Sequence, residues 1–252
     1  MNKFVIISTC HNVANWVSIN IQLLKYQSYK NFIGVYVNDK STDNTVDVIT
    51  KNIDNDSRFY CINTINGGSQ YKAYFEAIDF LNKNNLINDE DIIVEIDGDD
   101  WLSSVFVLQY LNQIYNDKNI WMTYGQYQIY PTGNLGGHSH MEISSDVDNT
   151  NSHRNYAFPY SHLKTYKYNL LKRINRNDLI DPRTKDYFKY AFDHGLCIPM
   201  VEMAGKSRIF RCEDILYTLN RSEELQNEGK VKVNEQKETE MLIRKGKVYT
   251  RL

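Results

Sequence analysis

The chain has 252 residues, a formal net charge of −2 and 42% hydrophobic residues. This length allows one large or two small domains, and the apolar fraction is sufficient for a sizeable core. The nearly balanced charge gives no general reason to expect binding to nucleic acid or to an anionic membrane. The 4 cysteines show no CxxC spacing, the first residues do not resemble a signal peptide, and no run reaches the ~20 apolar residues of a membrane-spanning helix. We therefore expect a soluble protein in the cytoplasm or another intracellular compartment.

Short apolar runs in residues 1–100 alternate with segments of helical periodicity. The runs are rich in β-branched and aromatic residues and predict strands at residues 4–8, 32–37, 58–62 and 91–94. The helices predicted between them carry apolar stripes of Val17, Ile21 and Leu24, of Val46, Ile49 and Ile53, and of Tyr71, Tyr74, Phe75, Ile78 and Leu81. This β-α-β-α-β-α-β order is typical of an α/β fold in which helices flank a mostly parallel sheet.

Polar and small residues follow each of these predicted strands. In chain order they are Thr9 and Asn12, Asp39, Gly67 and Gly68, and Asp97 and Asp99. In parallel sheets of this kind, ligands bind outside the carboxyl ends of the strands. The pattern therefore predicts a binding site along one edge of the sheet.

Residues 97–100 contain three carboxylates directly after the fourth strand. Because burying unpaired carboxylates costs free energy, the strand must end at a surface or a cleft. In an extended segment Asp97 and Asp99 point to the same face, and Gly98 between them lets a ligand approach the backbone. Such oxygen ligands suit Mg²⁺ or Mn²⁺ bound to phosphate, with a solvated acidic turn as the alternative. A calcium loop of the EF-hand type is excluded, because Leu102 and Leu108 stand where Gly and Glu are needed.

Three segments, taken in order, resemble the motifs of the family 2 glycosyltransferases, which have the GT-A fold. Residues 6–12, 38–45 and 97–100 are similar to the family's S/T-x-x-N start, its D-D-G-S-x-D-x-T segment and its D-x-D-D motif. Asn38 and Lys40 depart from the family's Asp and Gly, whereas Asp39 is retained. The resemblance implies a GT-A domain that transfers a sugar from a nucleotide-diphospho-sugar with inversion.

The resemblance also implies roles for the residues at the sheet edge. The donor would be a UDP-sugar, and the cofactor would be Mn²⁺ or Mg²⁺ held on the diphosphate. The implied nucleotide-sugar contacts are Thr9, Asn12 and Asp39 on the uracil and ribose side and Asp97 and Gly98 near the ribose, and the implied metal ligands are Asp97 and Asp99.

The segment after the third strand offers positive charge for the diphosphate. Lys72 falls near the start of the predicted helix, and a helix N-terminus behind Gly67 favours an anion. The alternatives are a solvent-facing lysine and an ordinary turn before a helix.

Beyond residue 101 the pattern predicts a helix at residues 105–114, a strand at residues 120–125 and then a change of character. Residues 133–155 are polar and poor in apolar residues, which is typical of a long loop. We expect a flexible segment over the active site, with an insertion of no function as the alternative. His138 and His140 in this segment are weak evidence for zinc, because no cysteine lies nearby.

Residues 161–166 resemble a stretch that contributes to the acceptor side in a subgroup of the family. His162 and Lys164 would meet the acceptor or the diphosphate there, with a charged surface strand as the alternative.

The candidate catalytic base is Asp193, which lies among aromatic and apolar residues. Such surroundings raise the pKa of a carboxylate and make it a better base. The stretch also resembles the segment that bears the base in this family. Asp214 is the alternative base, because many family members place it in an E-D dipeptide. Glu202 is a further candidate in the same stretch as Asp193, but we expect it to form a structural ion pair instead.

Together these features predict one GT-A domain, with a nucleotide-sugar half at residues 1–125, an acceptor half at 126–220 and a charged tail with a peripheral helix at 221–252. The predicted activity is metal-dependent, inverting transfer of a hexosyl or N-acetylhexosaminyl group from a UDP-sugar to a hydroxyl of a glycan or other acceptor. A sugar-phosphate nucleotidyltransferase would share the sheet, but residues 8–12 lack its Gly-rich, basic phosphate loop. A non-catalytic sugar-binding module has no need of carboxylates at the strand ends.

Overall fold

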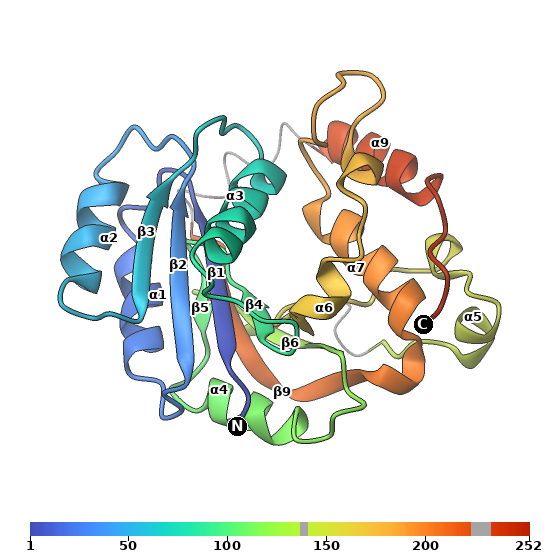
Figure 1. The fold of residues 1–252 in the computed structure, drawn as a ribbon, viewed down its shortest axis with the longest axis horizontal. Helices are drawn as coiled ribbons and strands as arrows, with labels where there is room; N and C mark the ends of the chain where they lie inside the picture. Colours follow the sequence, from blue (N-terminus) through green and yellow to red (C-terminus); the bar gives the residue numbers. More distant parts are fainter. Residues whose placement is uncertain (137–140, 223–232) are drawn as a thin grey trace.

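The strands in the first half of the chain form a parallel sheet, as the alternating pattern predicts (Figure 1). The computed structural model describes residues 1–136, 141–222 and 233–252. Strand β1 (Phe4–Cys10) pairs in parallel with β2 (Phe32–Asn38) and with β4 (Ile92–Glu95), and β2 pairs in parallel with β3 (Phe59–Asn63). Because these strands run the same way, their carboxyl ends meet at one edge of the sheet.

The second half of the chain extends this sheet with strands of both directions. Beyond β4 the order continues with β8 (Thr165–Lys167), β6 (Met122–Tyr130), β9 (Ile209–Asn220) and β5 (Trp101–Leu102). Strand β8 is antiparallel to both β4 and β6, whereas β6 and β9 are parallel, and β7 (Asn134–Leu135) forms a hairpin with β6. The predicted α/β fold is confirmed, and its sheet is mixed.

Helices cover both faces of the sheet (Figure 1). On one face, α1 (Val17–Lys25), α2 (Thr45–Ile53) and α4 (Val107–Ile114) share an apolar core with Phe4 and Ile6 of β1. On the other, α3 (Gln70–Lys83), α6 (Tyr168–Leu171) and α7 (Phe192–Ala204) share a core with Val5 and Ile7. Successive side chains of β1 thus alternate between two cores, which explains why the whole run is apolar.

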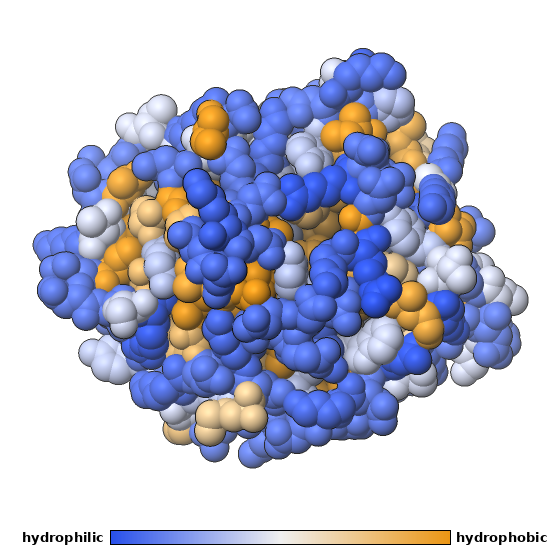
Figure 2. Space-filling model, viewed as in Figure 1, coloured by the Kyte–Doolittle hydropathy of each residue, from blue (hydrophilic) through white to orange (hydrophobic). Residues whose placement is uncertain are grey.

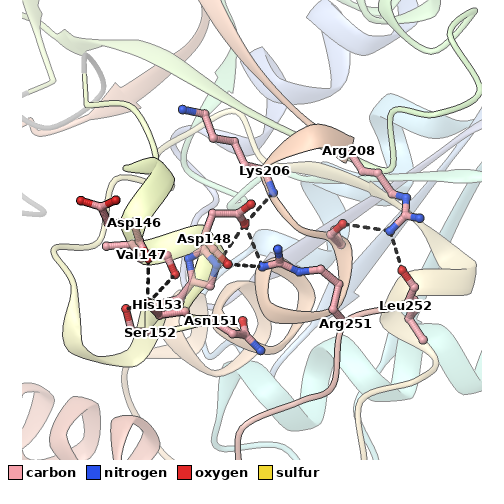
Figure 3. A network of polar contacts seen from close by, with 12 residues as sticks. Asp146, Val147, Asp148, Asn151, Ser152, His153, Lys206, Arg208, Arg251 and Leu252 are labelled. Carbon is pink, nitrogen blue, oxygen red and sulfur yellow. Dashed lines mark hydrogen bonds and ion pairs between the residues drawn. The ribbon is translucent and has the colours of Figure 1, made fainter.

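The segment predicted as a loop, residues 133–155, contains regular structure in its described part. Besides β7 it forms α5 (Ser145–Asn149) and the short helix η1 (His153–Asn155), while His138 and His140 lie outside the described residues. Figure 3 shows the Asp148 carboxylate accepting from the Lys206 N–H and from the Arg251 side chain, both at 2.8 Å. The loop prediction is therefore wrong for α5 and η1, because these charged contacts hold α5 against the C-terminal residues. The predicted flexibility remains a prediction.

The remaining elements pack the C-terminal residues onto α7. They are η2 (Arg176–Leu179), η3 (Lys206–Arg208) and α9 (Val233–Arg244), the last being the peripheral helix expected in the tail. Glu202 of α7 accepts from Arg154 at 2.6 Å and from the Tyr249 N–H at 2.9 Å, which confirms its predicted ion pair. No helix in the described parts of the chain is long and apolar enough to cross a membrane. The face seen in Figure 2 is mainly hydrophilic, with small hydrophobic patches.

Candidate active site

The loop after β4 is a tight turn. The Asp100 N–H donates to the Asp97 carbonyl oxygen at 3.1 Å. A Cβ at Gly98 would lie 2.6 Å from the Cys10 Sγ, so glycine is required here by packing against β1. The predicted extended geometry is therefore wrong, and the need for Gly98 is explained without a ligand. The carboxylates of Asp97 and Asp99 nevertheless line the same cavities, as predicted.

Buried polar groups hold this loop from two sides. The Asn20 amide of α1 donates to the carbonyl oxygens of Asp97 at 3.1 Å and Asp100 at 2.8 Å, and its oxygen accepts from the Tyr36 hydroxyl at 2.7 Å. The Asp100 carboxylate, only 2% exposed, accepts from the Asn220 N–H of β9 at 2.6 Å. The loop is therefore anchored both to α1 and to the end of β9.

Two cavities meet at the Asp97–Asp99 turn. One, of about 290 Å³, lies at the ends of β1 and β2, and the other, of about 570 Å³, lies between this turn, β6, β9 and the start of α7. Asp97, Asp99 and Gln70 line both of them. The Gln70 side chain donates to Asp97 Oδ1 at 2.8 Å. The site thus has two compartments with a shared acidic boundary.

The smaller cavity contains the residues predicted to bind the nucleotide. Thr9, Asn12 and Asp39 line it. The Asp39 carboxylate accepts from the Gly68 N–H at 2.8 Å, and a Cβ at Gly67 would lie 2.4 Å from Asp39 Oδ1. The two glycines do not line this cavity but hold Asp39 in place, and the phosphate contact of Gly67 stays a prediction.

Lys72 does not line either cavity. Its Nζ pairs with Asp186 at 2.5 Å beside a separate cavity of about 400 Å³. Its backbone N–H donates to Ser69, the N-cap of α3. In this structure Asp186 thus holds the Lys72 ammonium group away from both cavities, and the contact of Lys72 with the diphosphate stays a prediction.

His162 and Asp193 line the larger cavity, and Lys164 lies behind them. Lys164 is 1% exposed, and its Nζ lies 2.8 Å from Asp193 Oδ1 and 3.2 Å from His162 Nδ1. It is not among the residues that line either cavity. The structure thus places Lys164 behind the cavity and His162 at it, and contact of either with an acceptor or diphosphate stays a prediction.

Asp193 is ionised for a reason that the sequence did not reveal. Burial would raise its pKa, but the Lys164 ammonium group, aided by His162, lowers the pKa of Asp193 to about 2. The expectation of a raised pKa is therefore wrong, since a cation outweighs the apolar surroundings. The carboxylate remains able to accept a proton, as a weaker base than the sequence suggested.

The alternative base, Asp214, lies apart from the site. It is an exposed residue of β9, lies near Tyr110 and lines neither cavity. The structure therefore brings Asp193, and not Asp214, to the acidic boundary.

The donor chemistry of this boundary suits a divalent cation. Burial and then repulsion from Asp99 raise the pKa of Asp97 to about 7. A cation between the two carboxylates would remove that repulsion. Within the described residues there is no group of three or more His, Cys, Asp or Glu side chains able to hold a metal. A bound ion would therefore need further oxygen atoms from a ligand such as a diphosphate.

A comparison of the sequence with models of protein families identifies the family of this chain. The model of the family described as glycosyl transferase family 2 matches residues 5–183. The chain belongs to glycosyl transferase family 2. By this membership it is classed among the glycosyltransferases, as the sequence predicts, although a comparison with curated proteins gave no match.

Solved structures share the GT-A fold of this family 2 chain. TarS 1–349 of S. aureus with UDP is 18% identical over 90% of this chain and 62% of that chain, with a TM-score of 0.65. The mannosyltransferase PcManGT from Pyrobaculum calidifontis with GDP-Man and Mn²⁺ is 15% identical over 98% of this chain and 65% of that chain, with a TM-score of 0.64. Glucosyl-3-phosphoglycerate synthase from Mycobacterium tuberculosis with Mn²⁺ and UDP is 13% identical over 90% of this chain and 75% of that chain, with a TM-score of 0.56. The chain thus spans under two thirds of the TarS and PcManGT structures.

The larger cavity of this family 2 chain also contains residues that no motif marked. Phe158 stacks on His194 with ring centroids 3.9 Å apart, and His194 pairs with Glu240 of α9 at 3.2 Å. Gln236 and Arg221 line the same cavity. These residues come from distant segments, so only the fold brings them together.

Proposed function

We propose that this protein is an inverting, metal-dependent glycosyltransferase that moves a hexosyl or N-acetylhexosaminyl group from a UDP-sugar to a hydroxyl of a glycan or other acceptor. The observation that carries this proposal is the pair of cavities that meet at Asp97 and Asp99, with Asp39 in one and Asp193 in the other. Transfer requires a nucleotide compartment and an acceptor compartment with the reacting carbon at their boundary. Family 2 membership supports the same reaction class.

The smaller cavity would take the nucleoside. The Asp39 carboxylate is an acceptor only, so it suits the N3–H of uracil and disfavours the unprotonated N3 of cytosine. Thr9 and Asn12 supply a hydroxyl and an amide to the same cavity. The TarS structure contains UDP and the PcManGT structure contains GDP-Man, so guanine is the base to test against uracil.

Asp97 and Asp99 would hold Mn²⁺ or Mg²⁺ on the diphosphate. The ion would neutralise negative charge on the leaving group. Structures of PcManGT and of glucosyl-3-phosphoglycerate synthase contain Mn²⁺. In this chain, Gln70 orients the Asp97 carboxylate through its 2.8 Å hydrogen bond.

Asp193 would act as the base in the acceptor compartment. Its carboxylate takes the proton of the acceptor hydroxyl, and the hydroxyl oxygen bonds to the anomeric carbon while the bond to the diphosphate oxygen breaks. UDP carries away the bonding electrons. Attack on the side opposite to the leaving group inverts the configuration, and the placement of Asp193 and Asp39 in different cavities supports such a single displacement.

The substitution Asp193→Asn tests this mechanism, because the amide keeps the shape but cannot take the proton. Transfer should slow by about 10²–10⁴-fold. UDP affinity should stay unchanged, since Asp193 does not line the smaller cavity. Asp214→Asn is the matched control and should transfer normally. Near-normal transfer by Asp193→Asn together with a collapse in Asp214→Asn would overturn the assignment.

A panel of nucleotide-sugars separates the three function classes. A glycosyltransferase slowly hydrolyses its donor to UDP and sugar when the metal is present. A sugar-phosphate nucleotidyltransferase instead forms sugar phosphate when pyrophosphate is added, and a sugar-binding module gives no product.

A further inference from the structure

Lys164 lies directly before β8 with its ammonium group inside the protein. The residue is 1% exposed, and its Nζ lies 2.8 Å from Asp193 Oδ1 and 3.2 Å from His162 Nδ1. A buried ammonium group needs charge and hydrogen-bond partners. Burial would lower the pKa of Lys164, but Asp193 and then Glu95 outweigh it, so the net pKa is above its ordinary value. Lys164 is therefore a charged donor inside the site.

The contact with His162 determines where the histidine carries its proton. A lysine ammonium group has three N–H donors and no acceptor. His162 Nδ1, 3.2 Å away, must therefore accept and cannot carry a proton. The proton of the neutral ring then lies on Nε2. Burial and the nearby Lys164 charge also lower the pKa of His162 to about 3, so the ring is neutral at pH 7.

Packing and the start of α7 place His162 and Asp193 at the larger cavity. The His162 ring stacks on Tyr217 with centroids 4.5 Å apart and an interplanar angle of 12°. Asp193 lies in the first turn of α7, and its side chain is 40% exposed although one oxygen contacts Lys164. Both Asp193 and His162 line the larger cavity. A single buried cation thus touches two of the groups that face the acceptor compartment.

We infer that Lys164 is the positioning residue of this compartment, where it holds Asp193 as an oriented carboxylate and His162 as the neutral tautomer protonated on Nε2. The larger cavity then presents a proton acceptor and an N–H donor side by side. Only the interpretation of Asp193 as a base rests on the proposed function; the two protonation states do not. The ionisable and charged groups that influence this cluster from neighbouring elements are Glu95, Asp97, Tyr71, His194, Cys197 and Arg221.

NMR of the whole chain tests the protonation states without any substrate. ¹⁵N spectra of the imidazole rings give the tautomer of His162, whose signals are assigned by their loss in His162→Gln. ¹³C spectra of the carboxyl groups give the pKa of Asp193, assigned with Asp193→Asn. In the wild-type protein we expect the proton on Nε2. In Lys164→Met the pKa of Asp193 should rise by at least about one unit, because the opposite charge is gone.

Two further variants separate positioning from a general structural role. Lys164→Arg keeps a charged donor and should retain the Nε2 tautomer and the low pKa of Asp193. Lys72→Met removes the ion pair with Asp186, which lines a separate cavity, and should change neither. In steady-state transfer, Lys164→Met should lower kcat by at least ~10-fold with the donor KM unchanged, and Lys164→Arg should restore part of it.

The outcomes distinguish this inference from the proposed function. A proton on Nδ1 in the wild-type protein, or an unshifted Asp193 pKa in Lys164→Met, overturns the inference even if transfer is seen. The expected NMR states in a protein that transfers no sugar support the inference and contradict the function. If Lys164→Met does not fold, the wild-type tautomer and the Lys164→Arg spectra still decide the question.

Discussion

The Asn20→Ala substitution should destabilise the protein by about 2–4 kcal/mol, because two buried hydrogen bonds and one partly buried one are lost at net values of about 0.5–1.5 kcal/mol each. Asn20 is 1% exposed, and its partners are the Asp97 and Asp100 carbonyl oxygens and the Tyr36 hydroxyl, at 3.1, 2.8 and 2.7 Å. Alanine leaves the Asp100 carbonyl oxygen and the Tyr36 hydroxyl buried without this partner, whereas the Asp97 carbonyl oxygen keeps its hydrogen bond from the Asp100 N–H. For a chain of this size each kcal/mol lowers Tm by roughly 2–4 °C, so the total shift should be about 4–16 °C.

The same substitution should weaken donor binding although Asn20 lines neither cavity. It supports the turn that carries Asp97 and Asp99, and we expect the UDP Kd with Mn²⁺ to rise by at least ~10-fold, which corresponds to about 1.4 kcal/mol. Urea denaturation gives the stability change if the m-value is unchanged, and calorimetric titration gives the affinity.

The matched control is Asn84→Ala, which removes an exposed amide that donates to the Phe80 carbonyl at 2.8 Å. It should cost at most ~1 kcal/mol and leave the affinity unchanged. A loss of under ~1 kcal/mol in Asn20→Ala, or an unchanged UDP affinity, would refute the reasoning that this amide organises the turn.

Three further predictions concern the site. UDP should bind at least ~10-fold more tightly with Mn²⁺ or Mg²⁺ than in chelator, and Asp99→Ala should abolish that difference, whereas equal affinities in the wild type would exclude the ion. UDP should outcompete CDP and GDP, and Asp39→Ala should erase most of the preference over CDP, since a hydrogen bond to a charged group contributes about 1.5–3 kcal/mol. The pKa of His162 falls from 6.5 to about 3 on folding, so its contribution to stability is full above pH 6.5 and is lost as the pH falls toward 3. Between pH 7 and pH 5 the wild type should therefore lose up to about 2 kcal/mol more than His162→Gln in urea denaturation, and equal losses would contradict the buried neutral ring.

The elements that the sequence predicted best are those whose signal is local. The alternation of apolar runs and helical stripes predicts β1 to β4 and α1 to α3, because each element lies within one short segment. The positions of Asp39, Asp97 and Asp193 at two joined cavities agree with the motifs as well.

The errors arise where a partner comes from a distant segment. Asp193 was expected to have a raised pKa because its neighbours in sequence are apolar, but Lys164 reaches it only in the folded chain. Partners from distant segments also explain contacts that no motif marked: Asn20 is buried because the turn after β4 lies against it, and Lys72 pairs with Asp186 from the other half of the chain.

The place of β9 in the sheet has a consequence for how the protein acquires its site. This strand is the last of the described sheet in chain order, and it lies between β6 and β5. Its final residues hold the Asp97–Asp100 turn, through Asn220 and the Tyr217 hydroxyl at 2.7 Å from Asp100. During synthesis the Asp97–Asp100 turn therefore cannot be completed until residues 209–220 have been made. Until then the edges of β5 and β6 that pair with β9 stay unpaired, and such edges favour association with other chains. Because β9 pairs with strands that are far away in sequence, this part of the sheet should form slowly.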